Sequence, residues 1–96
     1  MVQRPDNLIE ALKQSIAQNH ACIAVYSQSV MVEETHRGEI LWAGQIEIFE
    51  VQGHTKAKTA YGWWQENTED GLVTILALTP IMDARKAVQA YLMSQD

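Results

Sequence analysis

The spacing of apolar positions changes character along this chain. Apolar residues recur at helical intervals between residues 5 and 19 and again between residues 83 and 95. Between these two segments the spacing falls to every second residue, in stretches rich in β-branched and aromatic side chains. A period of 3.6 lines one stripe of a helix, whereas a period of two lines one face of a strand. The pattern predicts a helix at each end and strands at residues 23–35, 40–51, 59–65 and 72–78.

Residues with strong local preferences mark the expected boundaries. Asp6 and Asp83 are of the type that caps the start of a helix, and Asn19 suits the left-handed residue that ends one. Gly38 supplies the positive φ of a hairpin turn. Gly44 lies within the second predicted strand, which indicates a bulge, a bend or the close approach of another backbone.

The connections between the predicted strands are short, which favours an antiparallel meander. Each helix has to bury its apolar stripe, most simply against one face of the sheet. The sequence therefore predicts a single α+β domain over residues 1–96. We expect a two-layer sandwich of order α-β-β-β-β-α, a four-stranded antiparallel meander with both helices packed on one face.

Composition and charge exclude several classes of function. The chain has 96 residues, 47% of them hydrophobic and 20% charged, which is ordinary for a globular domain. Twelve acidic residues outnumber seven basic ones, and the net charge of −5 disfavours nucleic acid as a partner. A single cysteine forms no internal disulfide and suits a reducing compartment. Without an apolar signal segment or membrane span, we expect a cytoplasmic protein with no membrane partner.

Antiparallel strands bring distant residues to one end of the sheet. The first strand begins there and the second ends there, so His20, Cys22 and His54 are expected to lie close together. With Tyr61 they would line a pocket between sheet and helices. Cys22 beside a histidine could form a thiolate pair or two ligands of a metal. The alternative is a buried, inert cysteine with two loop histidines. Because no metal-binding or nucleophile motif is present, we predict no catalytic residue, no metal and no cofactor.

Carboxylates and lysines give weaker signals. Glu33 or Glu34 could meet Glu47 across the first two strands, but like charges directly opposite each other are unfavourable. Lys56 and Lys58 stand near aromatic residues, yet they do not offset the acidic excess. Neither set predicts a site.

Four large apolar residues are expected on the sheet face that the helices leave open. An exposed apolar patch of this kind usually marks a partner or a ligand groove, and a symmetric homodimer is the commonest solution. The alternative is a bulge at Gly44 that shifts the alternation and buries part of the set. The set comprises Leu41, Phe49, Val51 and Trp64.

A sequence pattern shared with other proteins runs through much of the chain. It comprises the segments VEETHRGEILWAGQIEIFEVQGH, AKTAYGW and ILALTPIMDARKAVQAYL. The chain resembles a group of small uncharacterised bacterial hypothetical proteins with Trp-x-Gly-x-Val-x-x-Phe-x-Leu-x-Gly-His-Pro and Tyr-Ala-Trp motifs. It departs from the pattern at Thr55, Gly62 and Trp64, where the group has proline, alanine and a small polar residue. The resemblance implies a recurrent Gly-His turn and no activity. The matching residues are Trp42, Gly44, Ile46, Phe49, Val51, Gly53, His54, Tyr61 and Trp63.

Two functional hypotheses follow from these observations. The first is a non-enzymatic α+β domain that forms a homodimer or binds a protein partner. The alternative is a domain that binds a small-molecule ligand, or a minor enzyme, with its pocket near His54, Cys22 and Tyr61.

Overall fold

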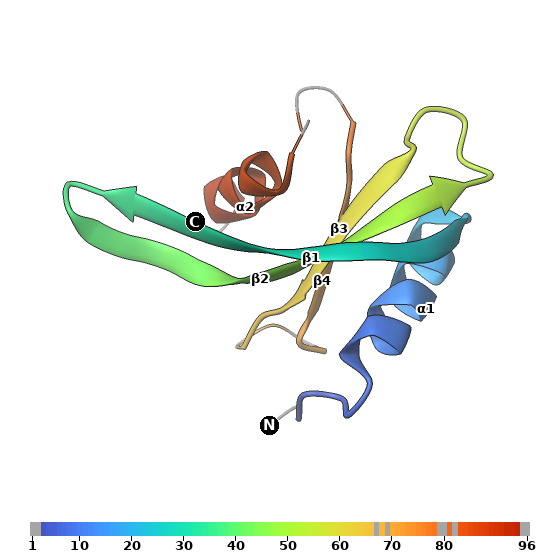
Figure 1. Cartoon of the computed structure of the whole chain (residues 1–96), viewed down its shortest axis with the longest axis horizontal. Helices are drawn as coiled ribbons and strands as arrows, with labels where there is room; N and C mark the ends of the chain where they lie inside the picture. The colour runs from blue at the N-terminus through green and yellow to red at the C-terminus, as the bar shows by residue number, and fades with distance from the viewer. Residues whose placement is uncertain (1–2, 67, 69, 79–80, 82, 95–96) are drawn as a thin grey trace.

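A computed structural model describes residues 3–66, 68, 70–78, 81 and 83–94. The predicted order of elements and the α+β class are confirmed. The segments that follow the third and fourth predicted strands, a turn expected at 66–71 and a connection expected at 79–82, each include residues outside this described part. In chain order the elements are α1 (Leu8–His20), β1 (Ile23–His36), β2 (Glu39–Gln52), β3 (Thr59–Trp64), β4 (Leu72–Leu76) and α2 (Ala84–Met93) (Figure 1).

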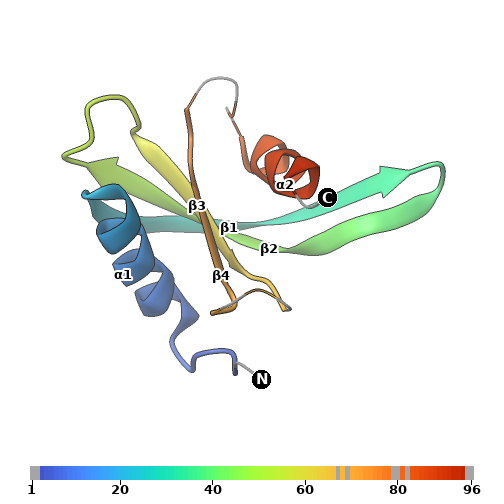
Figure 2. The same cartoon turned by 180° about the vertical axis from the view of Figure 1, so that it is seen from behind.

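The strands form one antiparallel sheet in the order β1-β2-β3-β4, which confirms the predicted meander. β2 pairs with β1 along nearly its whole length, but with β3 only from Glu47 to Glu50. The far part of the β1–β2 hairpin therefore extends beyond the other strands as a two-stranded ribbon, plainly visible in Figures 1 and 2. We call residues 30–46 the arm.

Two bulges interrupt the pairing of β1 with β2. The register shifts between Tyr26 and Gln28, leaving Ser27 as an extra residue in β1. It shifts back between Glu34 and Thr35, where Leu41 is the extra residue in β2. An extra residue reverses which face the following side chains occupy. Even-numbered residues of β1 therefore lie on one face before Ser27 and on the other face after it.

Gly44 is not the site of a bulge. It pairs in register with Val32, and the strand continues through it without interruption. A Cβ added at Gly44 would come within 3.0 Å of the Trp42 ring. The glycine therefore makes room for a neighbouring aromatic side chain on the same face.

The two helices lie on opposite faces of the sheet, and the expectation of a two-layer sandwich with both on one face is corrected. On β3, a Cβ at Gly62 would come within 3.0 Å of Leu12 in α1. Its neighbour Trp63 packs against Tyr91 of α2, with ring centroids 5.6 Å apart. Adjacent residues of a strand point to opposite faces. Figures 1 and 2 show the sheet running between the helices.

The sheet requires two covers because β3 and β4 carry apolar side chains on both faces. Each helix accordingly closes its own core. Burial of a large apolar side chain in such a core stabilises the fold by about 1.5–3 kcal/mol. The α1 core contains Leu12, Ile16, Ala24, Phe49, Val51 and Ala60. The α2 core contains Val32, Trp42, Ile46, Tyr61, Trp63 and Val88.

Helix capping agrees with the prediction at one helix and differs at the other. Asp83 caps α2, its Oδ1 accepting a hydrogen bond from the Lys86 N–H at 2.8 Å, as predicted. At α1 the cap is Asn7, whose side chain accepts from the Glu10 N–H at 3.1 Å, and not Asp6. α1 ends at His20, and Ala21 takes the left-handed conformation that was expected at Asn19. The change of cap moves the predicted start of α1 by a single position.

Candidate functional site

His20 and His54 lie at the same end of the sheet, as the antiparallel topology predicts. His20 is the last residue of α1, and its Nε2 atom is buried without a hydrogen-bond partner among the described residues. Burial lowers the pKa of His20 below 6.5, and the nearby charge of His54 lowers it further. The environment therefore favours the neutral imidazole of His20.

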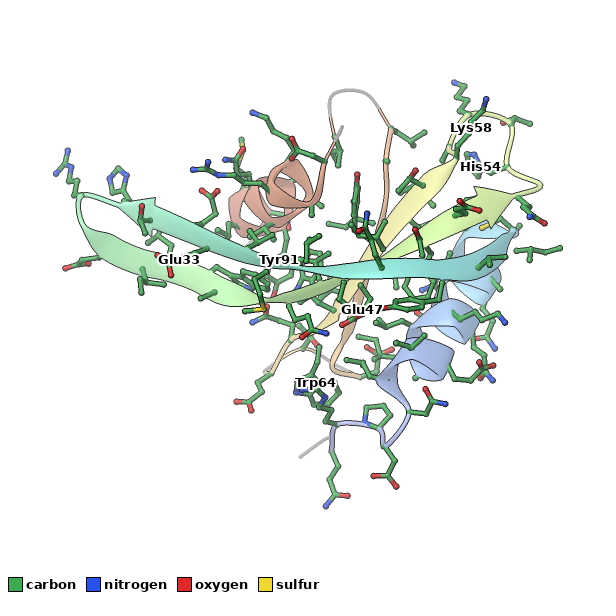
Figure 3. The ribbon with its side chains drawn as sticks, viewed as in Figure 1. Glu33, Glu47, His54, Lys58, Trp64 and Tyr91 are labelled. Carbon is green, nitrogen blue, oxygen red and sulfur yellow. The ribbon has the colours of Figure 1, made fainter. Side chains whose placement is uncertain are left out.

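His54 organises the loop between β2 and β3. Its Nδ1 atom accepts hydrogen bonds from the backbone N–H groups of Lys56, at 3.1 Å, and Ala57, at 2.9 Å. Figure 3 shows His54 and Lys58 in this loop, far from the arm that carries Glu33. With Nδ1 engaged by the backbone, His54 has a structural task of its own that accounts for its presence after Gly53.

Cys22 has the properties of an inert core cysteine. It is buried in the α1 core, and its Sγ–H points to the carbonyl oxygen of Ile16 at 3.9 Å. Burial raises the pKa of the Cys22 thiol, which disfavours the thiolate needed for nucleophilic or metal-binding chemistry. Over the described ranges, no three histidine, cysteine or acidic side chains come together as a metal site.

Tyr61 does not join His20, Cys22 and His54 in one pocket, so the predicted set is divided. Tyr61 belongs to the α2 core, whereas Cys22 belongs to the α1 core. The physical reason is the alternation along β3, which turns Tyr61 away from α1. The sheet itself separates the two groups of side chains.

A hollow of about 490 Å³ lies on the α2 face, beside the start of α2. We call it the Tyr61 hollow. Tyr61 is only 5% exposed, and its hydroxyl has no hydrogen-bond partner among the described residues. Burial raises the pKa of Tyr61, and the negative charge of Asp83 raises it further. The lining of the Tyr61 hollow includes Gln28, Ile48, Glu50, Thr59, Tyr61 and Asp83.

The expected apolar patch of Leu41, Phe49, Val51 and Trp64 is not formed. Phe49 and Val51 are buried under α1, and Trp64 packs half-buried against the same core. Leu41 is 55% exposed and stands apart at the bulge in the arm. The set was expected on an open face, but α1 covers that face.

Glu47 is buried without meeting another carboxylate. Ser29 lies opposite it across β1 and β2, and the Ser29 hydroxyl donates a hydrogen bond to its carboxylate. Gln45 donates a second hydrogen bond, at 2.8 Å, and Tyr26 shares a hydrogen bond with Ser29 at 2.7 Å. These neutral donors satisfy the carboxylate in a setting where a second charge would be costly.

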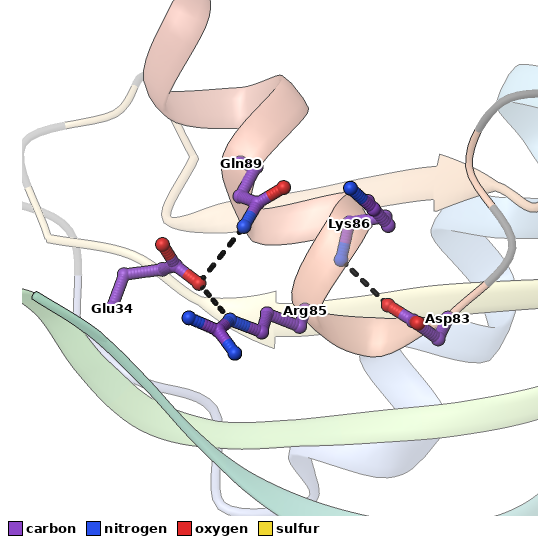
Figure 4. Close-up of polar contacts among 5 residues, drawn as sticks. All are labelled: Glu34, Asp83, Arg85, Lys86 and Gln89. Carbon is purple, nitrogen blue, oxygen red and sulfur yellow. Dashed lines mark hydrogen bonds and ion pairs between the residues drawn. The ribbon is translucent and has the colours of Figure 1, made fainter.

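Glu34 forms an ion pair with Arg85 that the sequence pattern did not predict. Its Oε1 atom accepts from Arg85 Nε at 2.5 Å and from Gln89 Nε2 at 3.2 Å (Figure 4). The hydrogen bond from Arg85 lowers the pKa of Glu34. The sequence feature that could have indicated this contact is the spacing of Arg85 and Gln89, which are four positions apart and share one face of the last helix.

Comparison with family models, with curated proteins and with solved structures finds no match. The resemblance to small bacterial hypothetical proteins stays a prediction. Within the described residues, no helix has the length and apolar character needed to cross a membrane.

Proposed function

We propose that this chain is a non-enzymatic α+β domain that associates with a second copy of itself through the outer edge of β1. The observation that carries the proposal is the absence of charge along that edge. From Ile23 to Val32 the strand has no charged residue and no proline. Edge strands of monomeric proteins usually carry such residues, because an unprotected edge pairs with other chains.

No other described strand pairs with the outer edge of β1. β1 is the first strand in the sheet order, so only its inner side pairs with β2. Both helices contact β1, α1 near Ala24 and α2 near Glu34, and residues 25–29 between these contacts are exposed. Met31, on the straight part of the strand beyond the Ser27 bulge, is 73% exposed. The backbone groups and side chains of this stretch are therefore accessible to another strand.

The charge pattern favours a second copy of the chain as the partner. Antiparallel pairing of two β1 strands about a two-fold axis at Val30 places Glu33 and Glu34 at or beyond the Ser27 bulge of the second copy, alongside the uncharged start of its strand. No glutamate then faces another, which avoids the repulsion of like charges across strands. A two-fold axis is the commonest symmetry of homo-oligomers. Pairing of this kind joins the two sheets into one.

The non-enzymatic character is supported by the state of the side chains that could perform chemistry. The thiol of Cys22 is buried with a raised pKa, and the Nδ1 atom of His54 is engaged by backbone N–H groups. Both residues have structural explanations that require no substrate.

The test is light scattering coupled to size exclusion over a dilution series. We expect the wild type to be a dimer, Met31→Lys to be a monomer, and Ile40→Lys to remain a dimer. Ile40 is a matched control because it is 61% exposed on the same arm but lies on β2. A wild type that is monomeric at every concentration refutes self-association. Equal disruption by both lysines assigns association to the apolar surface of the arm and refutes edge pairing.

A second function, binding of a small molecule, is favoured by the unpartnered hydroxyl of Tyr61. Its site would differ from the pocket expected from the sequence, because His54 and Cys22 lie across the sheet.

A further inference from the structure

The Tyr61 hydroxyl has no hydrogen-bond partner among the described residues, and unlike His20 Nε2 it stays accessible to solvent, at the Tyr61 hollow. The side chain is 95% buried, yet the hydroxyl makes no hydrogen bond to any described residue. Buried tyrosines normally place this group against a partner. Because Tyr61 lines the hollow, a molecule bound there would supply the missing hydrogen bond.

The hollow is also negatively charged. Glu50 contributes a carboxylate from β2 that has no hydrogen-bond or ion-pair partner among the described residues. Asp83 contributes a second one at the start of α2, and only its Oδ1 atom is engaged, by the Lys86 N–H. Neither carboxylate forms an ion pair among the described residues, although the charge of Asp83 acts on Arg85.

No basic side chain lines the hollow within the described part of the chain. Arg85 follows Asp83 closely in sequence, but it is turned toward Glu34, as Figure 4 shows. The charge of Lys86 likewise acts on Glu34. The net charge of −5 adds a further bias in favour of cations.

The remaining surface of the hollow is apolar, formed in part by Val30, Ile48 and Ala84. A volume of about 490 Å³ lies within the range of small-molecule sites, which join apolar walls to a few polar groups. We infer that the Tyr61 hollow binds a small organic cation, a primary ammonium group carried on an apolar body. The ammonium donates hydrogen bonds to Glu50, Asp83 and the phenol oxygen of Tyr61, and the apolar body lies against the walls.

The inference is tested by following backbone amide resonances during titration with phenethylammonium. Two probes of the same shape serve as controls, neutral 2-phenylethanol and anionic 3-phenylpropionate. We expect shifts at the residues of the hollow with phenethylammonium and much weaker shifts with either control. Equal binding of the alcohol, preferred binding of the anion, or shifts confined to other surfaces would overturn the inference. So would the absence of shifts up to the solubility limit of the amine.

Two variants identify the groups that bind. Tyr61→Phe removes only the hydroxyl, and Asp83→Asn removes a charge while keeping a good helix cap. We expect each to weaken binding about tenfold, the value of a hydrogen bond to a charged group. Asp70→Asn is the matched control, since Asp70 accepts from the Leu72 N–H outside the hollow. Unchanged affinity in Tyr61→Phe, or equal losses in both asparagine variants, would contradict the assignment.

Folding and association are separated from binding by two further measurements. Tyr61→Phe should unfold at the same or a higher urea concentration than the wild type, because the hydroxyl has no partner in the free protein. A marked loss of stability would show that the hydroxyl is already satisfied and overturn the argument. The titration repeated in Met31→Lys should give the same affinity, whether or not the wild type forms a dimer.

Discussion

Gly71 is expected to be the position least tolerant of a single added methyl group. It is buried directly before β4 with φ of +76°, a conformation that side chains other than glycine rarely adopt. The ring of Trp64 lies against its Cα, and a Cβ at this position would overlap that ring. Gly71→Ala therefore combines two perturbations, an unfavourable backbone conformation and a collision with an aromatic side chain.

The two contributions can be separated, because other glycines of the chain have the unfavourable backbone conformation without a close aromatic ring. Gly38 and Gly53 have φ of +82° and +85°, and an added Cβ at either would meet no atom within 4 Å. The left-handed conformation alone costs about 1–2 kcal/mol for a residue with a side chain. Forcing an additional carbon into packed structure costs typically about 1–3 kcal/mol more. We expect losses of about 1–2 kcal/mol for Gly38→Ala and Gly53→Ala, and about 2–5 kcal/mol for Gly71→Ala.

Urea unfolding followed by far-ultraviolet circular dichroism measures these losses without relying on the fluorescence of Trp64. A further comparison places Gly71→Ala in a Trp64→Leu background. If the ring causes the excess loss, the cost of Gly71→Ala should fall there to that of Gly38→Ala. Equal losses at all three glycines in the wild-type background would refute the role of the ring.

Three further predictions concern burial and protonation. Stability should fall as pH drops below about 6.5, because the unfolded state binds a proton at His20 before the folded state does; His20→Gln should reduce that slope in urea titrations. Glu34→Gln should lower the urea midpoint at pH 7 more than Glu33→Gln, and the gap should close as pH falls below 4.5 through the lowered pKa of Glu34. Phe49→Ala should cost about 3–5 kcal/mol in chemical denaturation, whereas Leu41→Ala should be nearly neutral.

The secondary structure could be predicted from the sequence because the local patterns are consistent. The second strand was expected at 40–51 and is Glu39–Gln52. Ile40, Trp42, Ile46 and Ile48 were expected on one face; the last three lie there, but the extra residue Leu41 turns Ile40 to the other face. Such patterns depend only on neighbouring residues, and each residue adds to the same signal. The meander follows because short connections leave neighbouring strands few other arrangements.

The placement of the helices could not be obtained from the same patterns. The adjacent Trp63 and Trp64 point to opposite faces, and both are packed, so each face needs a cover. This signal was present in the sequence. Its meaning depended on knowing that α1 and α2 each reach only part of the sheet, and that follows from the twist and length of the strands in space.

Some features of the candidate sites could likewise be predicted from the sequence, and others could not. The approach of His20 and His54 follows from topology alone, because the ends of neighbouring strands coincide. A pocket beside Tyr61 was expected, but its lining by Glu50 and Asp83 was not, because that lining depends on where α2 begins relative to the sheet. A largely buried tyrosine whose hydroxyl opens to a hollow is likewise a property of three-dimensional packing, which no sequence pattern reveals.

The extra residue Ser27 connects these features. Before it, Ala24 points into the α1 core; after it, Val32 points into the α2 core, although both positions are even. A single strand thus serves two cores on opposite faces, and each helix covers only one half of the hairpin. Beside the bulge, the α2 face is left open next to the start of α2, and Ser27 itself lines the Tyr61 hollow. Deletion of Ser27 would direct Val32 toward the α1 face and away from the α2 core. The same bulge contributes Ser27 to the lining of the Tyr61 hollow.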